Sequence, residues 1–213
     1  MTLVKICGIN SDASMDAAAE AQADYVGFVF FPASPRFVTP VEAAMLSRRQ
    51  QGATPRRVGL FVNPGFDEVE ISLREISLDI LQVYGNAALV AALRVRFGRP
   101  VWHQLGVASA ADFPAPDDHA DGYVVEARPP PGATRPGGNA VQADWPLLAG
   151  FPGAKPWLLA GGLRPGNVAE ALRITGAPGV DVSSGVETAR GWKSPALIKS
   201  FIAAARGAGT DIP

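Results

Sequence analysis

The chain has 213 residues, of which 47% are hydrophobic and 18% charged, and its formal net charge is −1. This composition is typical of one folded domain, and a near-neutral charge without a basic block argues against a nucleic-acid partner. A single cysteine excludes an internal disulfide, and the absence of a signal-peptide pattern or of an apolar run near ~18 residues favours a soluble, cytoplasmic protein with no membrane partner.

Short apolar runs recur along the whole chain and predict eight β-strands. Most are rich in Val, Ile, Leu or Phe and do not alternate cleanly with polar residues, a pattern typical of strands buried on both faces of a parallel sheet. The runs are Leu3–Cys7, Tyr25–Phe30, Arg57–Phe61, Asp79–Val83, Pro100–Leu105, Gly122–Val125, Pro156–Leu159 and Gly179–Val182.

Helix signals lie between these runs. Thr39, Pro40 and Glu42 supply an N-cap, a first-turn proline and a capping-box glutamate. Ser194 and Pro195 repeat the cap and the proline. Apolar residues at helical spacing occur in Leu89–Leu93, in Pro165–Arg173 before a stop at Gly176, and at Ile198, Phe201, Ile202 and Ala205.

Eight strands that alternate with helices predict a single closed (β/α)₈ barrel over residues 1–206. The alternative is an open doubly wound sheet, which usually has fewer strands. The weakest interval lies between Leu105 and Gly122, because Ala108–Asp112 allows at most a short helix. We expect Pro129–Gly138 to be a long loop rather than a linker, and residues 207–213 to form a frayed tail.

Two loops rich in glycine and serine follow the seventh and eighth predicted strands. In such barrels the active site lies at the carboxyl ends of the strands, and phosphate is commonly bound after these two. Glycines let the backbone approach an anion, and serines add hydroxyl donors. The alternative is a pair of ordinary turns. The predicted phosphate-binding residues are Gly161, Gly162, Ser183, Ser184 and Gly185.

Cys7, the only cysteine, ends the first predicted strand. Side chains alternate along a strand, so Lys5 and Cys7 point to the same side, and an interior Lys5 needs a carboxylate such as Asp181. Lys5 is expected to lower the pKa of the thiol. Cys7 is then either a core residue or a base or nucleophile.

Other polar residues are candidates for the same end of the barrel. Glu126 ends the sixth strand and is either a solvated loop residue or a general acid. Arg36, between prolines, suits a carboxylate or phosphate or else lies on the rim. His103 is expected to be satisfied inside the barrel and His119 to be solvated, and no Cys/His spacing indicates a metal.

Several motifs, in order along nearly the whole chain, resemble phosphoribosylanthranilate isomerase. They are Lys5-Ile6-Cys7-Gly8-Ile9, Gly27-Phe28-Val29-Phe30 with Ser34-Pro35-Arg36, Val58-Gly59-Leu60-Phe61-Val62, Leu81-Gln82-Val83-Tyr84-Gly85, Leu159-Ala160-Gly161-Gly162-Leu163 and Asp181-Val182-Ser183-Ser184-Gly185-Val186-Glu187.

The resemblance implies a cofactor-free Amadori rearrangement of phosphoribosylanthranilate in tryptophan biosynthesis, by a monomer or homodimer. Cys7 matches the base that removes the C2′ proton, and Glu126 occupies the place of the acid. Arg36 matches an arginine that holds the anthranilate end, and Gln82 and Asp181, in matching motifs, are expected to contact the substrate.

Three positions or segments depart from the family pattern. The acid is Glu126 instead of aspartic acid, and Gln-Leu-His-Gly is Gln82-Val83-Tyr84-Gly85. The usual Gly-Gly-Thr-Gly-Lys-Thr-Phe-Asp-Trp is replaced over residues 137–145. The additional methylene of Glu126 moves the carboxyl by more than ~1 Å, a misplacement that can cost on the order of 100-fold in rate. A related isomerase with another phosphorylated aminosugar substrate, or a non-catalytic sugar-phosphate-binding paralog, are the alternatives.

Overall fold

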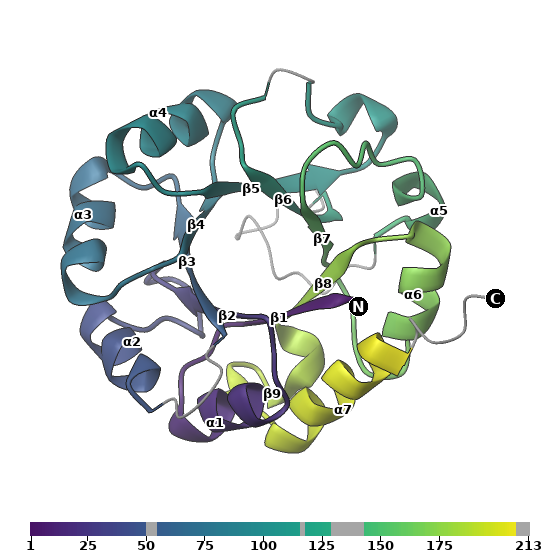
Figure 1. Cartoon of the computed structure of the whole chain (residues 1–213), viewed down its shortest axis with the longest axis horizontal. Coiled ribbons are helices and arrows are strands. Elements are labelled where there is room, and N and C mark those ends of the chain that lie inside the picture. The colour runs from purple at the N-terminus through teal and green to yellow at the C-terminus, as the bar shows by residue number, and fades with distance from the viewer. Residues whose placement is uncertain (50–54, 116–117, 129–142, 208–213) are drawn as a thin grey trace.

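The computed structural model describes residues 1–49, 55–115, 118–128 and 143–207. Its eight parallel strands form a closed ring surrounded by helices (Figure 1). The ring closes because β8 pairs with β1, with Asp181 beside Lys5 in the register. The predicted barrel is therefore confirmed, and the open sheet is excluded. The strands are β1 (Leu3–Cys7), β2 (Tyr25–Val29), β3 (Arg56–Val62), β4 (Ile80–Tyr84), β5 (Val101–Val107), β6 (Gly122–Ala127), β7 (Trp157–Leu159) and β8 (Gly179–Val182).

Helix ends follow the predicted capping residues at Thr39 and Gly176, whereas the helix predicted from Pro165 begins at Val168. Thr39 accepts a hydrogen bond from the amide of Glu42, whose carboxylate accepts one from the amide of Thr39. Gly98 and Gly176 end two helices in the left-handed conformation, with φ of 58° and 63°. The helices are α1 (Asp12–Glu20), α2 (Pro40–Ser47), α3 (Phe66–Glu75), α4 (Ala87–Phe97), α5 (Trp145–Leu148), α6 (Val168–Thr175) and α7 (Pro195–Gly207), with the 3₁₀ turns η1 (Ala110–Asp112) and η2 (Ser184–Val186).

The interior of the barrel changes from apolar to polar along its axis. An apolar cluster that includes Tyr25, Trp102 and Leu158 fills the end near the start of the strands. Beyond it, buried polar side chains project inward from the strands, and they carry the chemistry described below. The main hydrophobic core lies between the strands and the surrounding helices. One end of the barrel is thus closed by packing, and the other holds functional groups.

A short antiparallel hairpin lies between η2 and α7, and the sequence pattern did not predict it. It consists of β9 (Glu187–Ala189) and β10 (Trp192–Lys193). Gly191, at the turn, has a φ of 85°, and a Cβ there would lie 2.6 Å from the carbonyl oxygen of Pro35. The hairpin therefore packs directly on the loop that carries Arg36.

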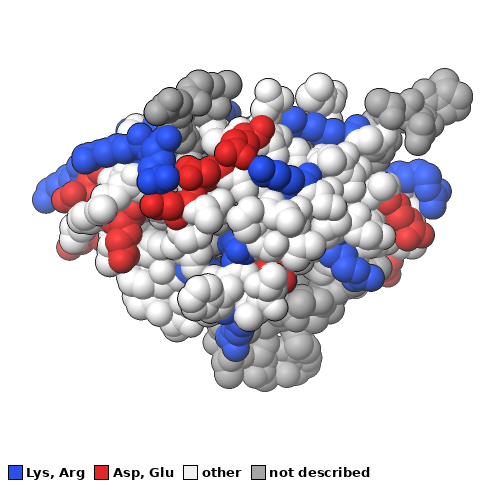
Figure 2. All heavy atoms as spheres, turned by 90° about the horizontal axis from the view of Figure 1, so that it is seen from below, with Lys and Arg blue, Asp and Glu red and all other residues white. Residues whose placement is uncertain are grey.

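Some predicted features fall outside the described residues. These are the loop Pro129–Gly138, most of the altered segment 137–145, and residues 208–213 of the predicted tail. Among the described helices, none has the length and apolarity needed to cross a membrane. On the face drawn in Figure 2, basic and acidic side chains are interspersed.

Candidate active site

One cavity opens at the carboxyl ends of the barrel strands. It is lined by every residue that the sequence predicts for the site: Cys7, Arg36, Gln82, Glu126, Gly161, Gly162, Asp181, Ser183, Ser184 and Gly185. These residues come from strands and loops spread along the whole chain. The closed barrel brings them together because the ends of all its parallel strands meet at one rim.

Cys7 lies above a buried ion pair. The ammonium of Lys5, which has no solvent exposure, donates to Asp181 Oδ1 at 2.7 Å, as the sequence predicts. Gly27, on the adjacent strand, makes room for both side chains, because a Cβ at that position would lie 3.0 Å from Cys7 Sγ and 3.2 Å from Lys5 Nζ. A side chain at Gly27 would therefore displace the thiol or the ammonium.

Lys5 favours a lower pKa for the Cys7 thiol, as predicted, but the pKa is raised overall. Burial is the largest cause, because the thiolate loses its hydration. Lys5 and the more distant Lys193 favour the thiolate, but Asp181 opposes it. The ammonium of Lys5 is largely compensated by its own carboxylate partner, which leaves burial dominant.

The carboxylate of Glu126 is held from two neighbouring strands. The hydroxyl of Tyr84 donates to Glu126 Oε1 at 3.2 Å, and Gln104 Nε2 donates to the same oxygen at 3.0 Å. Gln104 in turn accepts from Gln82 Nε2 at 2.6 Å. Burial and then the charge of Glu126 raise the pKa of Tyr84 well above its ordinary value, so the phenol stays a hydrogen-bond donor. Glu126 is therefore a buried, oriented carboxyl group.

Gln82 carries a polar atom that is unused within the described part of the chain. Its Oε1 is buried and has no hydrogen-bond partner there. Buried acceptors are nearly always satisfied, so an orphan at the lining of a cavity suits a donor on a ligand. A hydroxyl group of a sugar would supply that donor.

The two predicted phosphate loops touch each other. A Cβ at Gly185 would lie 1.7 Å from the carbonyl oxygen of Leu163, so only glycine allows this approach. Gly161 and Gly162 have positive φ angles of 87° and 67°. Asn167 braces the first loop by donating to the carbonyl of Gly162 at 3.1 Å. The glycines therefore shape one continuous backbone surface suited to an anion.

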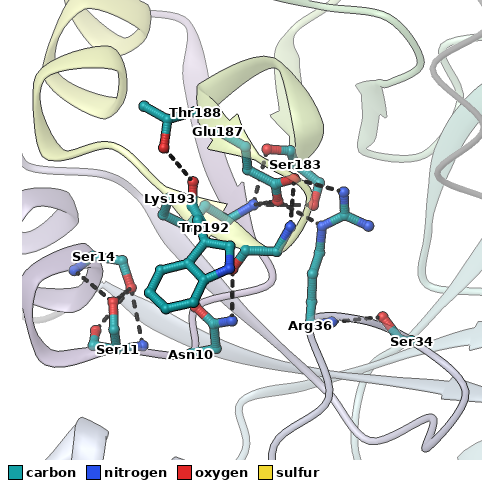
Figure 3. A network of polar contacts seen from close by, with 11 residues as sticks. Asn10, Ser11, Ser14, Ser34, Arg36, Ser183, Glu187, Thr188, Trp192 and Lys193 are labelled. Atoms are coloured by element: carbon teal, nitrogen blue, oxygen red, sulfur yellow. Dashed lines mark hydrogen bonds and ion pairs between the residues drawn. The ribbon is translucent and has the colours of Figure 1, made fainter.

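Arg36 is buried rather than placed on the rim. Its Nε and Nη2 donate to Glu187 at 2.6 and 2.9 Å, a bidentate pair that fixes the plane of the guanidinium (Figure 3). Gly8 lies against its stem, and a Cβ there would be 2.6 Å from Arg36 Cδ. Both bonds use one edge of the guanidinium, which leaves the Nη1 edge for a carboxylate in the cavity.

Neither histidine joins this site. His103 faces away from the barrel interior, because its strand neighbours Trp102 and Gln104 point inward. Its Nε2 lies 2.8 Å from the carbonyl oxygen of Gly85. His103 was expected to make its hydrogen bond inside the barrel, but it makes it on the outer side of the barrel wall. His119 is exposed, as predicted.

Several residues near the site were not predicted as site residues, and they include Gly27, Tyr84, Gln104, Glu187 and Lys193. Gly27 and Gln104 lie inside predicted strands, where the alternation of side chains could have placed them toward the interior. Lys193 follows Trp192 near the end of the chain and carries no local signal. Its side chain is nevertheless fully buried beside Glu187 and Ser183.

Comparison with known proteins agrees with this geometry. Residues 4–204 match the family model of N-(5′-phosphoribosyl)anthranilate (PRA) isomerase. The N-(5′-phosphoribosyl)anthranilate isomerase of Acidiphilium cryptum is 52% identical over 98% of this chain and 100% of its own. The crystal structure of phosphoribosyl anthranilate isomerase from Thermotoga maritima has a TM-score of 0.82 at 30% identity, covering 97% of this chain and 100% of that one. A structure of such an isomerase with reduced 1-(o-carboxyphenylamino)-1-deoxyribulose 5-phosphate has a TM-score of 0.79 at 29% identity, with coverage of 97% and 100%. This chain therefore belongs to the N-(5′-phosphoribosyl)anthranilate isomerase family.

Proposed function

We propose that the chain converts N-(5′-phosphoribosyl)anthranilate into 1-(2-carboxyphenylamino)-1-deoxyribulose 5-phosphate, with Cys7 as the base and Glu126 as the acid. The observation that carries the assignment of roles is one cavity that holds a thiol, an oriented carboxyl and two glycine-rich loops. The reaction oxidises C2′ and reduces C1′ of the same molecule, so it needs no redox cofactor. We place this step of tryptophan biosynthesis in the cytoplasm, in a monomer or homodimer.

In the first step Glu126 acts as a general acid. It gives its proton to the ring oxygen of the ribose while the bond between that oxygen and C1′ breaks. The electron pair of the anthranilate nitrogen forms the C1′–N double bond of a Schiff base. Tyr84 and Gln104 orient the carboxyl for this transfer.

In the second step Cys7, as the thiolate, removes the proton from C2′. The electrons of the broken C–H bond form the C1′–C2′ double bond, and the nitrogen regains its electron pair in an enolamine. Tautomerisation moves the hydroxyl proton of C2′ away and adds a proton at C1′, which yields the ketone. The Cys7 thiol and the Glu126 carboxylate then exchange one proton through solvent and regain their starting states.

The remaining residues hold the two charged ends of the substrate. The loops with Gly161, Ser183 and Gly185 support a phosphate site, because backbone N–H groups can converge there. Arg36 binds the anthranilate carboxylate through the guanidinium edge opposite Glu187. Gln82 and Asp181 contact the sugar hydroxyls between the two ends.

Replacement of the base tests this proposal. In Cys7→Ala we expect kcat for freshly generated phosphoribosylanthranilate to fall by at least ~100-fold, the range of a lost general base, with unchanged thermal unfolding. Restored growth of a tryptophan auxotroph by the wild-type gene, but not by this variant, is the cellular counterpart. A near-normal rate would rule the thiol out. Turnover only of another phosphorylated aminosugar would favour a related isomerase, and phosphate-dependent stabilisation without any turnover would favour a binding paralog.

A further inference from the structure

Lys193, on β10, is a buried cation that the proposed mechanism does not use. Its ammonium donates to the carbonyl of Ser183 at 2.8 Å, to the hydroxyl of Ser183 at 3.2 Å and to Glu187 Oε1 at 2.7 Å (Figure 3). An ammonium has three N–H donors, and these three acceptors use them all. The side chain has no solvent exposure. Lys193 is therefore fixed in one position against the second phosphate loop.

Glu187 is saturated in the same way. Its Oε1 accepts from Lys193 and from Arg36 Nε, and its Oε2 accepts from Arg36 Nη2 at 2.9 Å and from the amide of Gly191 at 3.0 Å. A carboxylate offers about four lone-pair positions, and all are filled. Arg36, Ser183, Glu187, Gly191 and Lys193 thus form a closed polar cluster, here called the Glu187 network.

The Glu187 network joins the two ends of the cavity. Ser183 belongs to the predicted phosphate loop after β8, and Arg36 comes from the loop after β2. Between them the network holds two cations and one anion, which leaves one buried positive charge beside the cavity. Buried ions are poor sources of stability compared with apolar packing, whereas a fully satisfied network fixes geometry. This arrangement suits a ligand with an anionic group.

We propose that Lys193 is a positioning residue that holds Ser183 for the substrate phosphate, while Arg36 keeps its own two hydrogen bonds to Glu187. The inference rests on the proposed function, because it assigns the phosphate end of that substrate to the loop that Lys193 holds. Lys193 does not touch the reacting atoms. Its removal should therefore weaken substrate binding more than it slows the chemistry.

Lys193→Met, which keeps the length of the stem and removes the charge, tests the inference. We expect KM to rise at least ~10-fold while kcat changes less than ~3-fold, the pattern of lost uniform binding. Because Cys7 acts as the thiolate, kcat/KM is expected to rise as the thiol ionises. In Lys193→Met this rise should move to higher pH, because the Cys7 thiolate loses a favourable cation. Lys199→Met is the matched control, since Lys199 is half-exposed and pairs with Glu20 on the outer surface. Unchanged KM, or a loss confined to kcat, would overturn the inference.

Two fragments separate this inference from the proposed function. Inorganic phosphate and anthranilate are titrated calorimetrically into the wild type, Lys193→Met and Lys199→Met. We expect Lys193→Met to weaken the binding of phosphate at least ~10-fold and the binding of anthranilate less than ~3-fold. Equal losses for both probes, or for neither, overturn the inference. Neither probe reacts, so the result holds whether or not the chain turns over phosphoribosylanthranilate. Lys193→Gln replaces the methionine variant if that variant does not fold.

Discussion

At the scale of single residues, the proposed acid and the proposed base differ in how the protein controls them. Glu126 is held by two hydrogen bonds from neighbouring strands. Cys7 is governed by burial, which raises the pKa of its thiol although cations lie nearby. The thiolate is therefore the minor form at neutral pH, but it is a strong base once formed. We expect kcat/KM to rise with pH, because a larger fraction of Cys7 is then in the thiolate form.

Tyr84 and Glu126 are two of the departures noted in the sequence motifs, and they contact each other. Glu126→Asp withdraws the carboxyl from Tyr84 and Gln104, so kcat should fall by on the order of 10- to 100-fold. Tyr84→Phe should lower kcat less in the Glu126→Asp background than in the wild type, because the hydroxyl has then lost its acceptor. Steady-state kinetics of the four proteins measure this coupling.

Tyr25→Phe serves as the control for this cycle. Tyr25 lies in the apolar cluster at the other end of the barrel, so its replacement removes the same hydroxyl group away from the active-site cavity. Equal costs of Tyr84→Phe in both backgrounds would show that the tyrosine acts independently of the carboxyl group.

At the scale of elements, the contact between the β7 and β8 loops is the tightest feature of the site. Gly185→Ala places a methyl group on the backbone of Leu163, and backbone cannot rotate away as a side chain can. We expect the loops to separate and KM to rise at least ~10-fold, with a lower melting temperature. Gly166→Ala is the matched control in the same region, because a Cβ there meets nothing within 4 Å.

Steady-state kinetics of both variants measure KM and the inhibition by inorganic phosphate. Thermal unfolding of both variants measures the melting temperature. Normal phosphate inhibition in Gly185→Ala would show that the closeness of the loops is unimportant for the anion.

The elements themselves were largely predictable because their signals are local. Each strand is a short apolar run, and α2 and α6 carry their cap residues beside them. The hairpin β9–β10 was missed because it is only three and two residues long and includes the exposed Trp192. No apolar run or alternation marks such an element.

The sequence predicted residues that line one cavity, but it did not predict the contacts between them. The rule that active sites lie at the carboxyl ends of barrel strands identifies which residues line the cavity, but it gives no distances between their atoms. The pairing of Arg36 with Glu187 spans 151 positions, and no local pattern indicates it. The net direction of the Cys7 pKa depends on how much hydration the thiol loses, which requires the packed structure.

At the scale of the whole molecule, the Glu187 network connects the site to acid stability. Burial alone would raise the pKa of Glu187, but hydrogen bonds and charge from Arg36 and Lys193 lower it to about 2. A lowered carboxyl pKa stabilises the fold above the ordinary value of 4.5, and this contribution is lost as the pH falls toward 2. The wild type should therefore exceed Glu187→Gln in unfolding free energy most clearly above pH ~5.

Denaturant unfolding between pH 7 and pH 3 measures this difference. The gap between the wild type and Glu187→Gln in unfolding free energy should stay constant down to about pH 5 and narrow below it. Glu20→Gln, at an exposed ion pair on the surface, should show almost no gap at any pH. A gap that stays constant down to pH 3 would contradict the role given to the ionised Glu187.

The closure of the barrel by β1 and β8 also determines when the site can form during synthesis of the chain. Lys5 and Asp181 are separated by 176 positions, yet they meet beneath Cys7. A chain synthesised from its amino end releases β1, which carries Cys7, first, and releases β8, which pairs with β1 and closes the barrel, last among the eight strands. Until β8 has left the ribosome, Lys5 lacks its carboxylate and the phosphate loop does not exist. The cavity therefore gains all of its lining residues only after β8 and the loop that follows it have been synthesised.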